Sequence, residues 1–278
     1  MITIADITNL QPASGSGFNQ LYTGRFGFRD VFIKVAGSAD QTAALKGESI
    51  GLRKLAGTGT IRIPEVIQLQ TDNLPAYLMM ERIGKGNPGP AFWELFGRQL
   101  ADLHRVSAPT FGFDEATFCG NVSMDNSFRS GWNSFYFENR LEPTFRWCYD
   151  HGLFADTDFG IFRRFSNWFL ADCRFPEEPP SLIHGDLWSG NFLVDEQGRP
   201  VLIDPSVCFG HREIDLGMSE LFGGFDRRFY RAYEESFPLA EGWPQRRPLA
   251  QLFHLLLHVR LFGGGYRSQT LSAMKQYG

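Results

Sequence analysis

Little in this sequence of 278 residues points to a secreted, zinc-binding or membrane protein. It has only four cysteines, and no two of them form a C-x-x-C pair, so neither a zinc site nor a disulfide framework is predicted. It has no run of about 18 apolar residues, so no membrane-spanning helix is predicted. A basic stretch followed by an apolar one is missing from the first residues, so we expect no signal peptide and a cytoplasmic protein.

A strong charge of one sign is also missing. The formal net charge is −4 and the isoelectric point is about 5.9, which gives no electrostatic reason to expect nucleic acid or an anionic membrane as a partner. Apolar residues are plentiful, at 43% of the chain, and they suffice for a sizeable core in one large domain or two lobes. The sequence does not report the oligomeric state, and a monomer is the default expectation.

The stretch richest in glycine and proline, residues 84–90, predicts a boundary between two lobes. Before it, runs of β-branched and aromatic residues predict strands at 21–23, 31–35, 64–69 and 76–83. A helix is predicted over 39–56. Beyond it, apolar spacing predicts helices at 91–106, 130–138, 158–174, 212–222, 227–237 and 248–262, with one obvious hairpin. We therefore predict an α+β bilobal, protein-kinase-like fold, with a nucleotide-binding lobe over 1–84 and a larger, mainly helical catalytic and acceptor-binding lobe over 85–278.

The most informative segment is residues 184–191, HGDLWSGN, which precede the hairpin and a second Asp. An Asp, an Asn five residues later, a hairpin and another Asp form the layout of a kinase catalytic segment. Asp186 can accept a proton from a substrate hydroxyl, and Asn191 and Asp204 offer the oxygen ligands that Mg²⁺ prefers beneath ATP. The alternative is a hairpin whose polar residues only form turns, but the whole combination favours a kinase.

Lys34 is the next candidate because it interrupts an otherwise apolar predicted strand. A kinase needs a Lys at such a place to contact the ATP phosphates, held by a Glu from the following helix. Glu48 lies fourteen residues later on that predicted helix. The alternative is a Lys on an edge strand that points to solvent. The downstream motif favours the functional interpretation.

Two weaker signals concern the rest of the nucleotide. The first is a run of small residues before the first predicted strand pair, and small residues allow backbone N–H groups to approach phosphate oxygens. The run is not a complete phosphate-binding motif, and a simple turn is the alternative. The run consists of Ser14, Gly15, Ser16 and Gly17. The predicted strand that ends at the lobe boundary should lie along the adenine, with backbone hydrogen bonds at Glu81 and Ile83. The alternative is an ordinary core strand, and only its position favours the adenine.

Two further residues are expected to support the catalytic loop. Asp215 can brace the loop through buried hydrogen bonds, or else cap the helix predicted to begin there, and we favour bracing. His184, at the start of the motif, is expected to be structural as well. We expect His104, at the end of its predicted helix, to cap that helix rather than to catalyse.

The acceptor site is the least defined part of the prediction. Aromatic residues near the motif could form its walls, and core packing is the alternative for each of them. These candidates are Trp132, Trp188 and, less favoured, Phe135. His211 and Glu213, in the segment after the second Asp, are added as further candidates for acceptor binding.

The motifs at 184–191, 203–205 and 210–216 together resemble the fructosamine (ketosamine) kinases. This family lies within the wider aminoglycoside-phosphotransferase group, which has a protein-kinase-like fold. The segments at 48–52 and 96–104 are also similar to the family pattern, so that the resemblance spans nearly the whole chain and is weakest after Ala240.

The resemblance implies a role for each matching residue. Asp186 would be the catalytic base, Asn191 and Asp204 the Mg²⁺ ligands, and Lys34 with Glu48 the pair that contacts the ATP phosphates. The implied reaction is ATP-dependent phosphorylation of a sugar hydroxyl on a ketosamine, classically at O3. The product is unstable and leaves its amine, so the implied role is deglycation of proteins or free amines.

The chain departs from the family at two places where an acceptor could bind. Of the Pro-Gln-x-Asn segment that is frequent in the family only Asn126 remains, and Cys208-Phe209 stand where a Tyr is common. One alternative is therefore an aminoglycoside or choline kinase, whose cationic acceptor would want acidic side chains such as Glu213 and Glu220. A catalytically silent, kinase-like binding protein is the other, although every expected catalytic position is filled.

Overall fold

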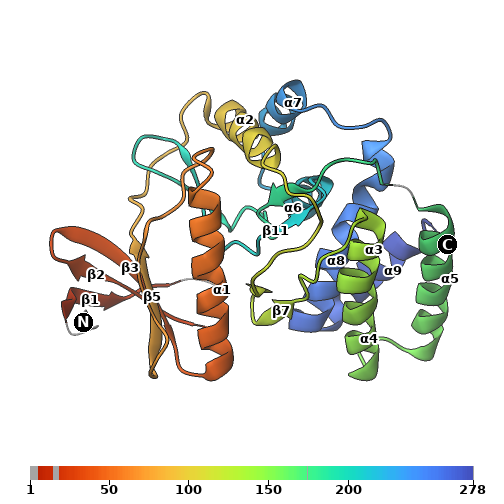
Figure 1. Cartoon of the computed structure of the whole chain (residues 1–278), viewed down its shortest axis with the longest axis horizontal. Coiled ribbons are helices and arrows are strands. Elements are labelled where there is room, and N and C mark those ends of the chain that lie inside the picture. The colour runs from red at the N-terminus through yellow and green to blue at the C-terminus, as the bar shows by residue number, and fades with distance from the viewer. Residues whose placement is uncertain (1–5, 15–18, 174, 278) are drawn as a thin grey trace.

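The computed structural model describes residues 6–14, 19–173 and 175–277. Figure 1 shows a smaller lobe built on a sheet and one long helix, and a larger lobe made mainly of helices. This confirms the predicted α+β bilobal architecture. None of the helices in the described ranges has both the length and the apolar character needed to cross a bilayer.

The small lobe is an antiparallel five-stranded sheet with the strand order β1-β2-β3-β5-β4. Its strands are β1 (Thr8–Pro12), β2 (Gln20–Phe26), β3 (Arg29–Ala36), β4 (Val66–Gln70) and β5 (Ala76–Glu81). Helix α1 (Ala39–Ala56) packs on one face, and its N-cap Ser38 accepts a hydrogen bond from the backbone of Gln41. The predicted helix and the predicted strands of this lobe are confirmed, with shifts of a few residues at the strand ends.

The alternation of side chains along β3 decides where Lys34 points. Val31 and Ile33 belong to a small core on the outer face of the sheet, whereas Ala36 belongs to the main core that includes the α1 leucines. Side chains two residues apart lie on the same face of a strand. Lys34 therefore shares the face of Ala36 and projects toward α1, rather than to solvent as the alternative required.

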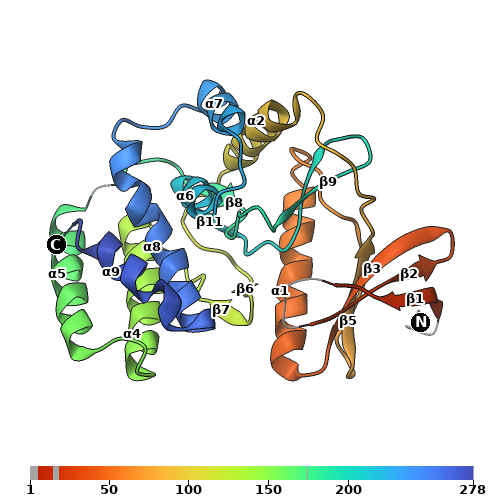
Figure 2. The ribbon, with the colours of Figure 1, turned by 180° about the vertical axis from the view of Figure 1, so that it is seen from behind.

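The large lobe is a set of helices that pack in pairs. Contacts join α2 (Phe92–His104) to α7 (Arg227–Ser236), α6 (Glu213–Leu221) to α8 (Trp243–Phe262), and α5 (Asp156–Asp172) to α9 (Arg267–Met274). Helix α3 (Trp132–Tyr136) continues through a π-helical turn (Phe137–Leu141) into α4 (Glu142–Asp150), which packs on α8. Figure 2 shows α6 and α8 from behind.

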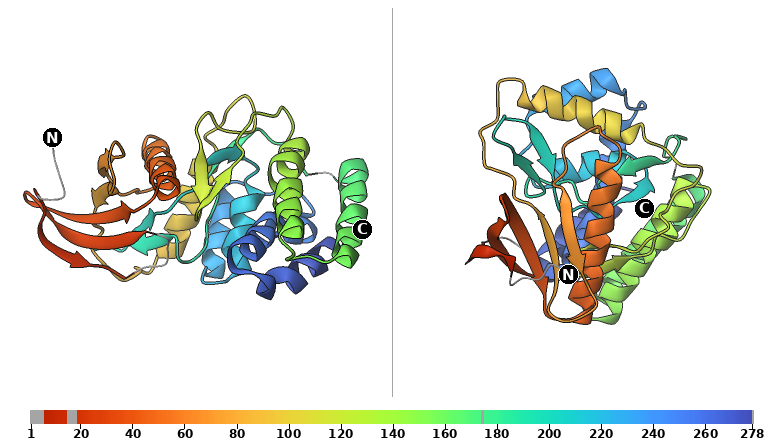
Figure 3. Two further views of the ribbon diagram at one scale, coloured as in Figure 1. Left: turned by 90° about the horizontal axis from the view of Figure 1, so that it is seen from below. Right: turned by 60° about the vertical axis from the view of Figure 1, so that its left-hand side comes forward.

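The large lobe also contains three short antiparallel strand pairs, which lie in the loops between its helices. They are β6 (Thr117–Cys119) with β7 (Val122–Met124), β8 (Ser181–Ile183) with β11 (Cys208–Gly210), and β9 (Phe192–Val194) with β10 (Pro200–Leu202). The β9–β10 pair is the predicted hairpin of the catalytic segment. The views of Figure 3 show the sheet lobe and the helical lobe from below and from the side.

Three expectations about elements of the large lobe were wrong or incomplete. The helix expected from residue 248 begins at Trp243, because Pro244 occupies its first turn, where a missing N–H costs nothing, and Pro248 lies inside the helix. Only the catalytic hairpin was predicted, but the large lobe also contains the β6–β7 hairpin. The three-residue strands of that hairpin are too short for their sequence to show alternation. Helices α4 and α9 were not predicted.

Candidate active site

The loop that carries Asp186 is fixed by a buried carboxylate. Asp215 accepts hydrogen bonds from the backbone N–H groups of His184 (2.7 Å) and Gly185 (2.8 Å). Burial would raise the pKa of Asp215, but the hydrogen bond and charge of His104 and the backbone bonds hold it below its usual value. Gly185 has a φ of 83°, and a Cβ there would collide with the backbone carbonyl of Ser206, so only glycine fits. Asp215 thus braces the loop.

Other buried histidines complete this support. His184 contacts the backbone oxygen of Ile203 through Nε2 (2.9 Å), which links the loop to the end of β10. On α2, His104 contacts both Asp215 (3.2 Å) and the hydroxyl of Tyr233 (2.8 Å). The expectation that His104 only caps its helix was wrong, because it is buried and joins three elements. His254 was not predicted at all: its Nε2 contacts the carbonyl oxygen of Gly185 at 3.0 Å.

Asp186 lies beside an amide and a thiol. The Nδ2 of Asn191 donates to both the backbone oxygen (2.8 Å) and the carboxylate (3.0 Å) of Asp186. Burial raises the pKa of Asp186 to about 7, while hydrogen bonds from Cys119 and Asn191 act to lower it. A carboxylate with such a pKa is suited to exchange a proton near neutral pH. Cys119, at the end of β6, was not predicted as a neighbour of the site.

Lys34 meets Glu48, as the sequence pattern suggested, and it also contacts Asp204, which was not predicted. The Nζ of Lys34 lies 2.7 Å from Glu48 Oε1 and 2.5 Å from Asp204 Oδ1. Burial would lower the pKa of Lys34, but the two carboxylates raise it overall, so the amine keeps its charge. Burial also raises the pKa of Glu48 to about 7, against the charge of Lys34. An N-lobe cation thus contacts a C-lobe carboxylate across the two lobes.

Asn191 and Asp204 lie at adjoining ends of the β9–β10 hairpin. The backbone N–H of Ile203 donates to the Asn191 carbonyl (3.0 Å), which keeps the two residues together. Asp204 adopts a φ of 54°, a left-handed conformation that Asp tolerates better than most residues. Its side chain stays 37% exposed. Because the Asn191 amide uses its nitrogen on Asp186, its oxygen remains for another ligand.

The oxygen atoms of Asn191 and Asp204 fit a Mg²⁺ ion that is also bound by phosphate groups. Among the described residues, no group of three or more His, Cys, Asp or Glu side chains is placed to hold a metal on its own. One carboxylate and one amide oxygen are the kind of partial ligand set that Mg²⁺ completes with phosphates and water. The chemistry of the donors therefore fits a metal that enters with a nucleotide.

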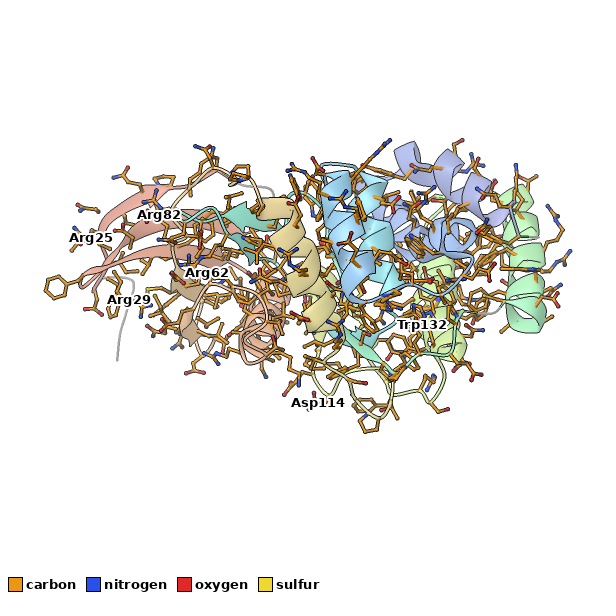
Figure 4. The ribbon with its side chains drawn as sticks, turned by 90° about the horizontal axis from the view of Figure 1, so that it is seen from above. Arg25, Arg29, Arg62, Arg82, Asp114 and Trp132 are labelled. Atoms are coloured by element: carbon orange, nitrogen blue, oxygen red, sulfur yellow. The ribbon has the colours of Figure 1, made fainter. Side chains whose placement is uncertain are left out.

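The strand that ends the N-lobe is tied to the catalytic hairpin by Arg62. Its guanidinium donates to the carboxylate of Glu81 (2.6 Å) and forms an ion pair with Asp195 in the β9–β10 turn. Figure 4 labels Arg62 among the side chains of the N-lobe. The backbone N–H of Glu81 is donated to Glu65, whereas that of Ile83 has no partner within the described part of the chain. Of the two positions predicted to bond the adenine, Ile83 therefore has an N–H without a partner among the described residues, whereas the N–H of Glu81 is already used.

The phosphate-binding prediction is only partly within the described residues. Ser14 is exposed after β1, while Gly15, Ser16 and Gly17 lie outside the described residues.

Three of the proposed acceptor residues are buried in the large lobe. Glu213 is fully buried and held by Arg246, with distances of 2.5 to 3.1 Å. His211 is buried, and burial lowers its pKa to about 4. Trp132 stacks on Tyr136 at 5.1 Å inside the core, and Figure 4 places it in the helical lobe. For these residues burial favours the packing alternative, and their role in acceptor binding stays a prediction.

Phe135 is fully buried as well, as the favoured alternative expected, whereas Trp188 is partly exposed. Trp188 therefore remains a candidate for acceptor binding.

Comparison with known proteins agrees with this geometry. Residues 2–277 match the sequence profile of the family described as fructosamine kinase. This chain belongs to the fructosamine kinase family. A protein of Enterococcus faecium named "Probable ketoamine kinase" is 35% identical over 266 residues, which cover 96% of this chain and 94% of that protein. The ketosamine-3-kinase of Mus musculus is 31% identical and covers 88% of this chain and 87% of its own length.

Solved structures place the family in a wider fold group. A Thermobifida fusca protein assigned to the fructosamine-3-kinases is 34% identical, with a TM-score of 0.86 over 98% of this chain and 93% of that one. An aminoglycoside phosphotransferase is 18% identical, with a TM-score of 0.67 over 99% of this chain and 95% of its own. The second likeness concerns the fold alone, and it confirms the kinase-like architecture.

The buried histidines predict a specific effect of pH on stability. Burial lowers the pKa of His254 to about 4, below the value of about 6.5 expected in an unfolded chain. Between these values the unfolded chain binds a proton that the folded one does not, so His254 contributes stability above pH 6.5 that is lost as the pH falls toward 4. The slope from one such group is about 1.4 kcal/mol per pH unit.

Because other groups titrate in the same range, the measurement compares two slopes. We expect the free energy of unfolding of the His254→Gln variant to fall less between pH 7 and pH 5 than that of the parent chain. Urea unfolding at several pH values measures both. Parallel slopes would contradict the burial of a neutral imidazole at this position.

Proposed function

We propose that this chain is an ATP-dependent kinase that phosphorylates a sugar hydroxyl of a ketosamine. The observation that carries the proposal is the convergence of Lys34, Glu48 and Asp204 beside Asp186 and Asn191. Residues 1–84 would form the nucleotide-binding lobe, and residues 85–278 the catalytic and acceptor-binding lobe. Membership of the fructosamine kinase family supports the choice of acceptor.

Each residue has a role in this reaction. The Asp186 carboxylate would accept the proton of the acceptor hydroxyl as its oxygen bonds to the γ-phosphorus, while the bond from that phosphorus to the β-phosphate oxygen breaks and ADP leaves. Lys34, oriented by Glu48, would neutralise phosphate charge. When bound, Mg²⁺ would be held by Asn191 and Asp204 and would add positive charge at the phosphates. The backbone of Ile83 would hydrogen-bond the adenine.

The product explains a role in deglycation. A ketosamine phosphate of the kind implied by the family loses its amine, so the proposed enzyme would release free amines from glycated peptides or small molecules. Both free and protein-bound ketosamines are possible substrates in this proposal.

One observation weighs against an aminoglycoside or choline acceptor. The two carboxylates named for a cationic acceptor are already paired with arginines: Glu213 with Arg246, and Glu220 with Arg247 at 2.6 Å. A cationic acceptor needs carboxylates that are not neutralised in this way. The ketosamine is therefore the favoured acceptor class.

A panel of acceptors tests the proposal. ATP consumption with Mg²⁺ would be measured against fructosyl-lysine, ribulosyl-lysine, an aminoglycoside and choline. We expect turnover of one or both ketosamines and little of the others. Turnover of only the aminoglycoside or choline would keep the mechanism and overturn the acceptor, and bound ATP without any turnover would favour a silent binding protein.

A further inference from the structure

A row of partly exposed rings begins at the catalytic loop and runs along the surface of the large lobe. We name it the aromatic strip, and it consists of Trp188, Phe222, His258, Phe262 and Tyr266. The ring of Phe222 lies 6.3 Å from that of Trp188 and 4.8 Å from that of His258, between ring centroids. His258 in turn lies 5.4 Å from Phe262 and 4.9 Å from Tyr266. The rings therefore form one continuous surface.

Several of these rings stay open to solvent. Phe222 is 39% exposed and Phe262 is 63% exposed, and neither belongs to the buried core. Contiguous exposed aromatic rings are uncommon on a soluble protein and mark binding surfaces more often than isolated ones do. The aromatic strip thus needs an explanation that core packing does not give.

The strip is joined rigidly to the loop that carries Asp186. Trp188 is two residues after Asp186, and Phe222 directly follows α6. On α8, His258 lies one turn after His254, which contacts the carbonyl of Gly185 at 3.0 Å. Helices α6 and α8 pack side by side, as Figures 1 and 2 both show. A ligand that contacts the strip would therefore stand at a fixed position relative to Asp186.

The loop after α6 also closes directly on the catalytic loop. Gly224 has a φ of 95°, and a Cβ at this position would lie 2.5 Å from the Cβ of Ser189. Only glycine allows this approach. The contact brings the start of the strip next to the residues between Asp186 and Asn191.

Several charged residues that lie near the strip residues in the sequence have other partners. Arg247 pairs with Glu220, Arg267 with Asp158, and Arg260 lies over the ring of Trp147 at 4.3 Å. His258 contacts the backbone oxygen of His254 through Nδ1 (2.7 Å), and burial lowers its pKa, so the ring is neutral at neutral pH. The five rings of the strip thus carry no charge at neutral pH.

The extent of the strip indicates what it contacts. Trp188, two residues after Asp186, is the member of the strip nearest the catalytic carboxylate in the sequence. From its ring, three successive centroid-to-centroid steps of 6.3, 4.8 and 5.4 Å lead to Phe262, a path longer than one sugar ring. Whatever contacts Phe262 must lie beyond the sugar, on the side of the amine to which it is attached.

We infer that the aromatic strip binds apolar or aromatic side chains that flank the glycated amine in a peptide. This inference rests on the proposed ketosamine kinase function and adds a preference among its substrates. Apolar side chains laid against exposed rings gain free energy from the surface that both remove from water. The enzyme would then favour glycated lysines that have apolar neighbours over small glycated amines.

Two substrates and three variants test the inference. The substrates are a short peptide in which a fructosyl-lysine is flanked by Phe and Leu, and fructosyl-glycine, which carries nothing beyond its amine. The variants are Phe262→Ala, the double variant Phe222→Ala with Phe262→Ala, and the control Phe28→Ala. Phe28 is 98% exposed between β2 and β3 of the other lobe. KM and kcat would be measured separately for each combination of enzyme and substrate, with the parent chain included.

For the double variant, which removes two rings, we expect kcat/KM for the apolar peptide to fall about tenfold, chiefly through a higher KM, and for Phe262→Ala alone we expect a smaller fall of the same kind. Turnover of fructosyl-glycine should change less than twofold, and Phe28→Ala should change neither. Equal losses for both substrates, or no loss for the peptide, would overturn the inference while ketosamine turnover continues. Failure of the parent chain to act on either ketosamine would instead overturn the proposed function, and the inference with it.

Discussion

Replacing Asp186 by Asn is expected to lower kcat by about 10³-fold, within the range for loss of a general base. The amide cannot take the proton of the acceptor hydroxyl, so the base is lost. Its oxygen can still accept the hydrogen bond from Asn191, which reaches the Asp186 carboxylate at 3.0 Å, so the loop should keep its shape. The change should therefore affect the chemical step and leave the nucleotide site intact.

Two measurements separate these effects. Steady-state kinetics with a ketosamine gives kcat, and thermal stabilisation by ATP with Mg²⁺ reports nucleotide binding. The matched control is Asp172→Asn, an exposed position at the end of α5, which should leave both unchanged. A variant at Asp186 that keeps more than a tenth of the parent kcat would contradict the role of this carboxylate as the base.

Replacing Asp215 by Ala is expected to produce the largest loss of stability, about 3–5 kcal/mol. The carboxylate accepts bonds from the backbone of His184 and Gly185 and from the ring of His104, all in the interior. Without it, two buried backbone donors lose their acceptor. For a chain of this size the midpoint of thermal unfolding should fall by roughly 10 °C.

Asp102→Ala is the matched control for this loss. Asp102 is exposed on α2 and pairs with Arg105 three residues away, a surface ion pair worth about 1 kcal/mol or less. Differential scanning calorimetry would compare both variants with the parent chain. A shift of less than 2 °C for Asp215→Ala, or equal shifts for the two variants, would show that Asp215 does not brace the loop.

The parts of the fold that could be predicted are those whose pattern is local. The alternation along β3 and the apolar spacing of α1 identified both elements and put Lys34 and Glu48 on facing surfaces. The spacing of Asp186, Asn191 and Asp204 depends on a hairpin with a short turn, so their approach also follows from nearby residues. Local geometry therefore gave most of the candidate site.

The parts that could not be predicted depend on partners far along the chain. Glu213 was offered as an acceptor residue because a carboxylate near the motif is suitable, but Arg246 neutralises it from another helix. The contacts of His104 with Asp215 and of His254 with Gly185 join residues 111 and 69 positions apart. Nothing near these residues in the sequence shows whether a histidine caps a helix, lies buried in the core or is exposed to solvent.

The most direct test of the central claim is to identify the phosphorylated product. The enzyme would be incubated with ATP, Mg²⁺ and fructosyl-lysine, and the mixture followed by ³¹P NMR, with Asp186→Asn as the blank. The claim predicts a sugar phosphate signal that requires the parent enzyme and declines as free lysine is released. ADP formed with inorganic phosphate alone, or phosphate transferred only to an aminoglycoside offered in its place, would contradict it.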